Sequence, residues 1–211
     1  MKNRLLKASF FPEFLLLCTV NLVLFAAGFL LYRGSFHYLY YPLSELGAVH
    51  TRSGVLNSSS RRVFTVQMLF NSSFFFYLAK RIRQADTPYI RWYVLLSRFA
   101  AVGMLILIFP YDVSNLFHSF GTGIMAASVL LMHTLAAKEA LQARRDRLLA
   151  AVLRVEWAAL GLYGFTCALQ ALIQQPIQKI AVCMLGIGSL AVSPFMKKPL
   201  AAESAEKMHS Q

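Results

Sequence analysis

Charged residues are scarce in this sequence, and its few cysteines lie in apolar stretches. Charged residues make up 14% of the 211 positions and hydrophobic residues 57%, and the mean hydropathy is +0.54. A soluble globular domain of this length would not usually combine these values. Because Cys18, Cys167 and Cys183 all fall within long apolar runs, neither a disulfide framework nor a thiolate metal site is expected.

Short catalytic motifs are also missing from the sequence. It contains no glycine-rich nucleotide-binding loop, no serine nucleophile elbow and no H-E-x-x-H zinc motif. Any metal ligands would therefore have to meet through tertiary packing rather than through their spacing along one helix.

Six apolar runs dominate the chain, each about long enough to cross a bilayer. A helix rises 1.5 Å per residue, so about 17 to 25 apolar residues span the hydrocarbon. The runs lie near residues 14–32, 63–79, 92–109, 117–137, 155–173 and 177–195. We therefore expect an all-α integral membrane bundle of six transmembrane helices over residues 1–198, followed by a disordered cytoplasmic tail over 199–211.

The basic residues gather on one side of this predicted bundle. The formal net charge is +12, and with the N-terminus in the cytoplasm fourteen lysines and arginines fall on that side against five on the other. The positive-inside rule then predicts both termini in the cytoplasm, with the protein in the cytoplasmic (inner) membrane. The basic loops are interpreted as topology signals and as contacts to anionic lipid, not as a nucleic-acid site.

The first external connection, residues 33–62, is long and aromatic. A loop this apolar is expected to lie at the membrane interface or to fold back over the mouth of the bundle, either as a simple aromatic anchor or as a functional lid. Its aromatic part precedes the segment Pro42–Gly47 and contains Phe36, Tyr38, Tyr40 and Tyr41.

The second external connection is short and carries Asp112 and His118. Three interpretations of Asp112 are open: a site residue, an N-terminal cap of the fourth helix, or a partner for Arg61 or Arg62. His118 is interpreted either as a site residue or as an interfacial histidine satisfied by its neighbours.

Few polar side chains lie within the predicted spans. Such side chains usually form hydrogen bonds between helices, and a substrate pathway is the alternative interpretation. Glu156 is expected to be an interfacial anchor and His133 to lie near the cytoplasmic end. The amide and hydroxyl groups in question are Gln67, Asn71, Ser72, Ser73 and Gln170.

Two short segments resemble a known pattern. Leu43–Ala48, together with Phe109–Asp112 and His118, is similar to a bacterial family of six-span proteins classed as a domain of unknown function. That family is similar in layout to the DRAM, Frag and Sfk type proteins, which are associated with lipid organisation, membrane trafficking and autophagy. The resemblance implies no established reaction, and it marks six positions as important: Ser44, Glu45, Gly47, Pro110, Asp112 and His118.

Three hypotheses about function follow. The first is a non-enzymatic membrane protein, without a cofactor, whose external polar site binds a lipid headgroup or a membrane-protein partner. The second is a metal-dependent lipid hydrolase that holds a divalent ion such as zinc through His50, Asp112 and His118, with Glu45 as the proton acceptor. The third is a small transporter that uses Asn71 and Gln170. The candidate external site comprises Ser44, Glu45, His50, Arg61, Arg62, Asp112 and His118.

Overall fold

The computed structural model describes residues 9–83, 87–144, 147–169 and 173–196, and within these ranges the protein is all-helical with no strand. The predicted tail and Gln170 lie outside the described residues. A short 3₁₀ helix, η1, spans Leu43–Gly47. The long helices are α2 (Phe11–Leu31), α3 (Ser58–Ile82), α4 (Ile90–Ile106), α5 (Asn115–Arg144), α6 (Arg147–Ala168) and α7 (Gln174–Val192).

Each helix overlaps one of the six predicted apolar runs over most of its length. The largest differences lie where α5 and α6 meet, because α5 continues to Arg144 and α6 begins at Arg147, beyond the apolar runs on both sides. Charged residues near a helix end are compatible with helical structure, so hydropathy alone underestimates the length of these helices.

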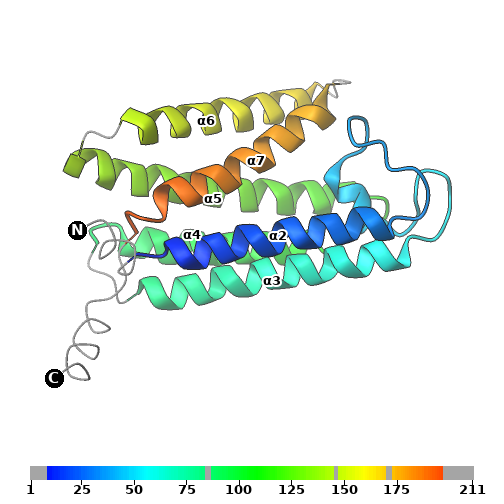
Figure 1. Cartoon of the computed structure of the whole chain (residues 1–211), viewed down its shortest axis with the longest axis horizontal. Coiled ribbons are helices and arrows are strands. Elements are labelled where there is room, and N and C mark those ends of the chain that lie inside the picture. The colour runs from blue at the N-terminus through cyan, green and yellow to red at the C-terminus, as the bar shows by residue number, and fades with distance from the viewer. Residues whose placement is uncertain (1–8, 84–86, 145–146, 170–172, 197–211) are drawn as a thin grey trace.

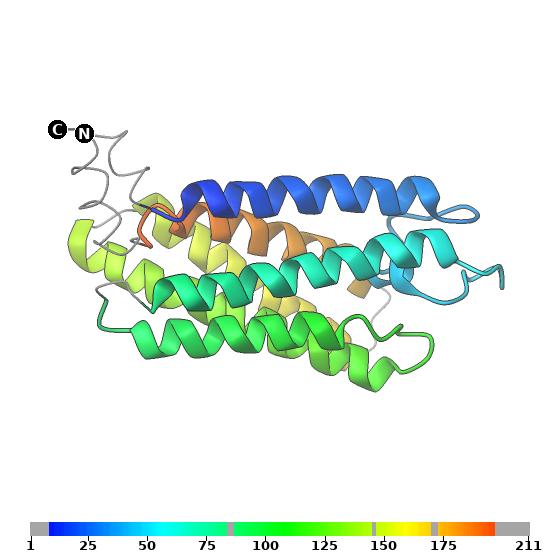
Figure 2. The same ribbon diagram turned by 90° about the horizontal axis from the view of Figure 1, so that it is seen from below.

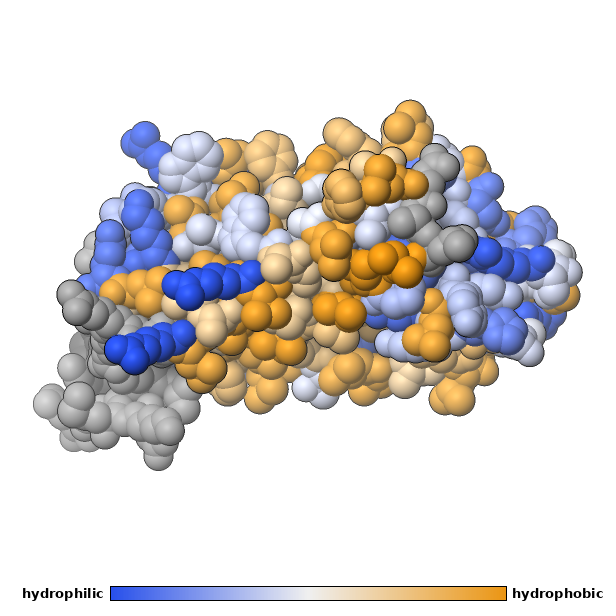
Figure 3. Space-filling model, turned by 90° about the horizontal axis from the view of Figure 1, so that it is seen from above, coloured by the Kyte–Doolittle hydropathy of each residue, from blue (hydrophilic) through white to orange (hydrophobic). Residues whose placement is uncertain are grey.

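Four of the helices are long and apolar enough to cross a membrane: α2, α5, α6 and α7. Helix α3 begins with three serines and two arginines, and α4 has only 17 residues. In Figure 3 the visible face carries hydrophobic residues over its middle, with hydrophilic residues gathered toward the two ends. This is the surface expected of a protein that contacts lipid around its waist.

Neighbours in sequence are neighbours in space for most of the bundle. Helices α2, α3, α4 and α5 pack one against the next, α6 packs on α7, and α7 also contacts α5 and α2 (Figures 1 and 2). The N–H of Phe10 donates to the carbonyl oxygen of Met196 at 3.2 Å, which joins the start of α2 to the segment after α7. We call this the closed end of the bundle, and the opposite end, where residues 32–57 and 107–114 connect the helices, the loop end.

Two glycines let α4 and α5 approach closely. A Cβ atom at Gly103 would lie 2.7 Å from the backbone nitrogen of Met125, and one at Gly121 would lie 2.9 Å from Ile106 Cγ2 and 3.0 Å from the carbonyl oxygen of Gly103. By contrast, a Cβ at Gly123 would meet nothing within 4 Å. Of the two glycines Gly121 and Gly123 in α5, helix packing therefore requires only Gly121.

An amide cluster joins α2 to α3. Asn21 Nδ2 donates to Asn71 Oδ1 at 2.7 Å, Asn71 Nδ2 donates back to Asn21 Oδ1 at 2.9 Å, and Gln67 Nε2 donates to the same oxygen at 2.8 Å. These side chains therefore satisfy one another between helices.

Replacing Gly121 by alanine is expected to destabilise the bundle by about 1 to 3 kcal/mol, because the new methyl group must push α4 and α5 apart. Gly123→Ala is the matched control on the same helix, and it should leave stability unchanged or raise it, since alanine favours helix over glycine. Thermal unfolding of both variants in detergent measures the difference. Equal effects of the two substitutions would contradict the close packing of α4 on α5.

Candidate functional site

The aromatic connection folds back over the loop end, one of the two arrangements that its composition predicts. Three backbone carbonyl oxygens of the η1 region accept hydrogen bonds from Asn57 Nδ2 at 3.3 to 3.4 Å, and Ser60 Oγ donates to that of Leu46 at 3.0 Å. On the other side, Gln178 Oε1 accepts from the N–H of Leu43 at 3.0 Å, and Lys179 Nζ donates to the carbonyl oxygen of Tyr41 at 2.7 Å. The loop is thus held between α3 and α7.

Glu45 lies at the centre of this end of the molecule and is fully buried. Its Oε1 accepts from the hydroxyl of Tyr32 at 2.8 Å, and its Oε2 accepts a short hydrogen bond from the hydroxyl of Tyr111. Arg52 Nε lies 3.5 Å from Oε2. Burial first, and then the bond to Glu45, raise the pKa of both Tyr32 and Tyr111 well above the ordinary tyrosine value, so both phenols remain protonated donors.

Asp112 binds backbone rather than a cation. Its two carboxylate oxygens accept from the N–H of Val49 at 3.1 and 3.0 Å, and Oδ2 also accepts from the N–H of His50 at 3.1 Å. The expectation that Asp112 pairs with Arg61 or Arg62 is wrong, because its carboxylate accepts these hydrogen bonds from the loop instead. Among the described residues, the ion pair at this end joins Arg52 to Glu45.

His118 is buried near the start of α5. Its Nδ1 lies 3.0 Å from the carbonyl oxygen of Phe109, and its ring meets that of Tyr111 edge to face at 6.3 Å between centroids. The geometry matches a histidine satisfied by its neighbours.

The ligands proposed for a metal ion do not converge. Within the described ranges, no group of three or more histidine, cysteine, aspartate or glutamate side chains is arranged to hold a metal ion. His50 is exposed and contacts Asp112 through its backbone, and the Asp112 carboxylate is occupied by backbone N–H groups. The arrangement of His50, Asp112 and His118 therefore gives no support to a zinc centre.

The remaining predicted site residues lie in η1 and near the start of α3. Ser44 is buried within η1, Arg61 is half-buried and Arg62 is exposed on the first turn of α3. Of the polar residues selected from the sequence, Glu45 and Asp112 are those whose side chains hold loop segments in place.

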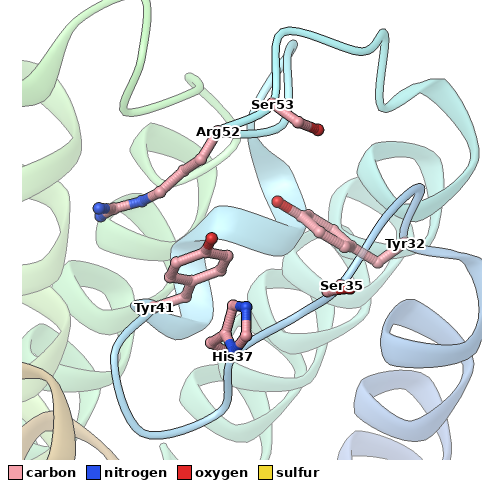
Figure 4. Close-up of a pocket in the computed structure, with 6 residues that line it drawn as sticks. All are labelled: Tyr32, Ser35, His37, Tyr41, Arg52 and Ser53. Carbon is pink, nitrogen blue, oxygen red and sulfur yellow. The ribbon is translucent and has the colours of Figure 1, made fainter.

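A small cavity opens beside this framework (Figure 4). It has a volume of about 190 Å³. The Arg52 guanidinium lies over the ring of Tyr41, 4.8 Å from its centroid. In Figure 4 the side chains come from two segments of the loop end, one carrying Tyr32 to Tyr41 and the other carrying Arg52 and Ser53. We call this cavity the Arg52 pocket, and it is lined by Tyr32, Ser35, His37, Tyr41, Arg52 and Ser53.

A tight turn presents Arg52 and Ser53 to the pocket. The N–H of Thr51 donates to the carbonyl oxygen of Val55 at 2.8 Å, and the N–H of Gly54 donates back to that of Thr51 at 2.8 Å. Gly54 has φ of +81°, a conformation that favours glycine. Sequence reasoning counted Arg52 among the external cations and did not select it, although the T-R-S-G turn that carries it was visible.

Comparisons with family models, with curated proteins and with solved structures find no match to this chain. The resemblance to six-span membrane families therefore stays a prediction.

Asp112→Ala is expected to release the loop segment at Val49 and His50. A hydrogen bond to a charged acceptor contributes about 1.5 to 3 kcal/mol, so local opening should become at least about tenfold more frequent. Hydrogen exchange of peptides that contain Val49 and His50 measures this, with Val113→Ala as the control because Val113 is adjacent and 67% exposed. Unchanged exchange in Asp112→Ala would show that the carboxylate does not hold the loop.

Proposed function

We propose that this chain is a six-span membrane protein with its loop end on the external face, and that the Arg52 pocket binds the phosphate of an anionic lipid headgroup. The carrying observation is Arg52 itself, a cation that lines the small pocket and is held in place by its neighbours. It is supported on one side by the buried carboxylate of Glu45 and on the other by the ring of Tyr41.

The gathering of basic residues at the closed end supports this orientation. Both ends of the described chain meet at the closed end through Phe10 and Met196, as an even number of crossings requires. Basic residues lie within or next to the helix ends at the closed end, which favours a cytoplasmic location by the positive-inside rule. They include Lys80, Arg81, Arg83, Arg91, Lys138 and Arg147.

The chemistry of the pocket lining suits a phosphate. Arg52 uses Nε toward Glu45, and no hydrogen bond within the described part of the chain occupies its two terminal nitrogens. A guanidinium that offers two parallel N–H groups is the side chain best matched to a phosphate. The imidazole of His37 and the hydroxyls of Ser35 and Ser53 add further hydrogen-bonding groups to the lining.

The size of the pocket restricts the ligand. At about 190 Å³ it lies below the 300 to 1,000 Å³ range of ordinary ligand pockets. It can accept a headgroup but not acyl chains. The neighbouring aromatic and aliphatic side chains Tyr38, Leu39 and Tyr40 are 50%, 58% and 71% exposed, which is the composition of an interfacial belt. A lipid whose chains stay in the membrane fits this geometry better than a free ligand from water.

Arg52→Ala is expected to weaken binding of short-chain phosphatidylglycerol by about 10- to 100-fold, because one charge-assisted contact contributes about 1.5 to 3 kcal/mol. Thermal unfolding of the purified protein in neutral detergent, titrated with this lipid, measures the affinity. Arg52→Lys should bind with intermediate affinity, since an ammonium keeps the charge but loses the bidentate geometry.

Arg62→Ala is the matched control, because Arg62 is exposed on the first turn of α3 and does not line the pocket. Phosphatidylcholine and inorganic phosphate complete the comparison, the first testing net charge and the second testing whether acyl chains are needed. Equal losses in Arg52→Ala and Arg62→Ala would overturn the pocket in favour of general surface attraction. Tighter binding of inorganic phosphate than of the lipid would overturn the lipid assignment.

The proposed orientation is tested with Ser53→Cys. This position lies in the exposed turn of the loop end, so a membrane-impermeant maleimide added to intact cells should label the variant. The unmodified chain, with Cys18, Cys167 and Cys183 within helices, supplies the background. Labelling only after the cells are opened would place the loop end in the cytoplasm and overturn the orientation.

A further inference from the structure

A second polar cluster lies among the helices, far along the chain from the Arg52 pocket. It comprises His133 of α5, Glu156 of α6 and Ser189 of α7, which are 1%, 0% and 5% exposed. The expectation that Glu156 is an interfacial anchor is wrong, because its side chain is buried against His133. Sequence reasoning did not select Ser189, since nothing in its local sequence distinguishes it from a helix-packing serine.

The three side chains form a continuous relay. His133 Nδ1 lies 2.7 Å from Glu156 Oε1, and His133 Nε2 lies 3.0 Å from Ser189 Oγ. With the proton on Nδ1, the imidazole donates to the carboxylate and accepts from the serine hydroxyl. This is the order of nucleophile, general base and orienting acid that activates a serine in acyl transfer.

Joining helices through a buried carboxylate carries a large desolvation free energy. Glu156 Oε2 is buried and has no hydrogen-bond partner among the described residues, so burying this carboxyl carries an uncompensated cost. The amides of Asn21 and Asn71 join α2 to α3 with their hydrogen-bonding atoms paired to each other. An acid that orients a histidine gives a reason for this cost that helix association alone does not.

Gly188 makes room for the acid. A Cβ atom at this position would lie 2.4 Å from Glu156 Oε2. The glycine next to the serine therefore allows α7 to approach the carboxylate closely enough for all three side chains to connect.

We propose that Ser189, His133 and Glu156 form an acyl-transfer centre that acts on a fatty-acid ester of a membrane lipid. Ser189 Oγ bonds to the ester carbonyl carbon while its proton passes to His133 Nε2. The ester C–O bond then breaks, and the leaving alkoxide takes that proton. Water, or a second alcohol, transfers its own proton to His133 as its oxygen bonds to the acyl carbon, and Ser189 regains a proton as it leaves.

The depth of Ser189 indicates the class of substrate. It lies three residues before the end of α7 at Val192, about 4.5 Å along the helix axis. In a helix that spans the bilayer, this depth is close to the glycerol esters that join headgroup to acyl chains. Because Ser189 is 5% exposed, the proposal requires the side chains that cover it to move aside when an ester enters.

A fluorophosphonate with an alkyl chain tests this centre. Its phosphorus bonds to an activated serine oxygen with loss of fluoride, and the alkyl chain carries it into detergent micelles that contain the full-length protein. One label per chain, mapped by mass spectrometry to Ser189, is expected. The rate should fall by at least about 100-fold in His133→Asn, because general-base catalysis contributes about 10²- to 10⁴-fold.

Ser193→Ala is the matched control. Ser193 is buried about one turn further along, and its Oγ donates to the carbonyl oxygen of Leu190 rather than to His133, so labelling should persist. Thermal unfolding of each variant checks that it is folded, and Glu156→Gln gives a second test that keeps the shape of the acid. An absence of label on folded wild-type protein, or labelling that survives His133→Asn, would overturn the proposal and leave the cluster as a structural contact between α5, α6 and α7. The outcome is independent of lipid binding at the Arg52 pocket.

Discussion

The burial of Glu45 organises the loop end of this protein. A buried carboxylate costs several kcal/mol unless nearby donors compensate it, and here two phenols and one guanidinium surround it. These partners come from three separate segments in two connections: Tyr32 follows α2 and Arg52 lies in the turn before α3, both in the connection between those helices, and Tyr111 follows α4. One acid therefore determines where three separate segments lie.

The Arg52 pocket is a consequence of this arrangement. Arg52 keeps its place beside this cavity because its Nε pairs with Glu45 and its guanidinium lies over the ring of Tyr41. Asp112 adds a second tie by accepting the N–H groups of Val49 and His50. Glu45 and Asp112, which the sequence suggested as site residues, thus hold the loop end in place through their hydrogen bonds.

The same constraint operates within the helices. A polar side chain among apolar ones needs a hydrogen-bond partner. Two clusters between the helices meet this need, one with amides and one with a carboxylate and an imidazole. Asn21 and Asn71 exchange hydrogen bonds with each other, whereas Glu156 directs one oxygen to His133 and its other oxygen has no hydrogen-bond partner among the residues that the structure describes. The first arrangement is that of helix association, and the second leaves part of the polar group uncompensated.

The sequence by itself determined the helices and the shortage of charge within them. Apolar runs are local, since each depends only on consecutive residues, so all six helices could be predicted, with errors at their ends such as the early start of α6 at Arg147. Tertiary structure alone decided the partners of the polar residues. Asp112 binds backbone, Arg52 meets Glu45 and Ser189 meets His133 across 56 positions, because hydrogen bonds between distant segments depend on how the helices pack and not on spacing along the chain.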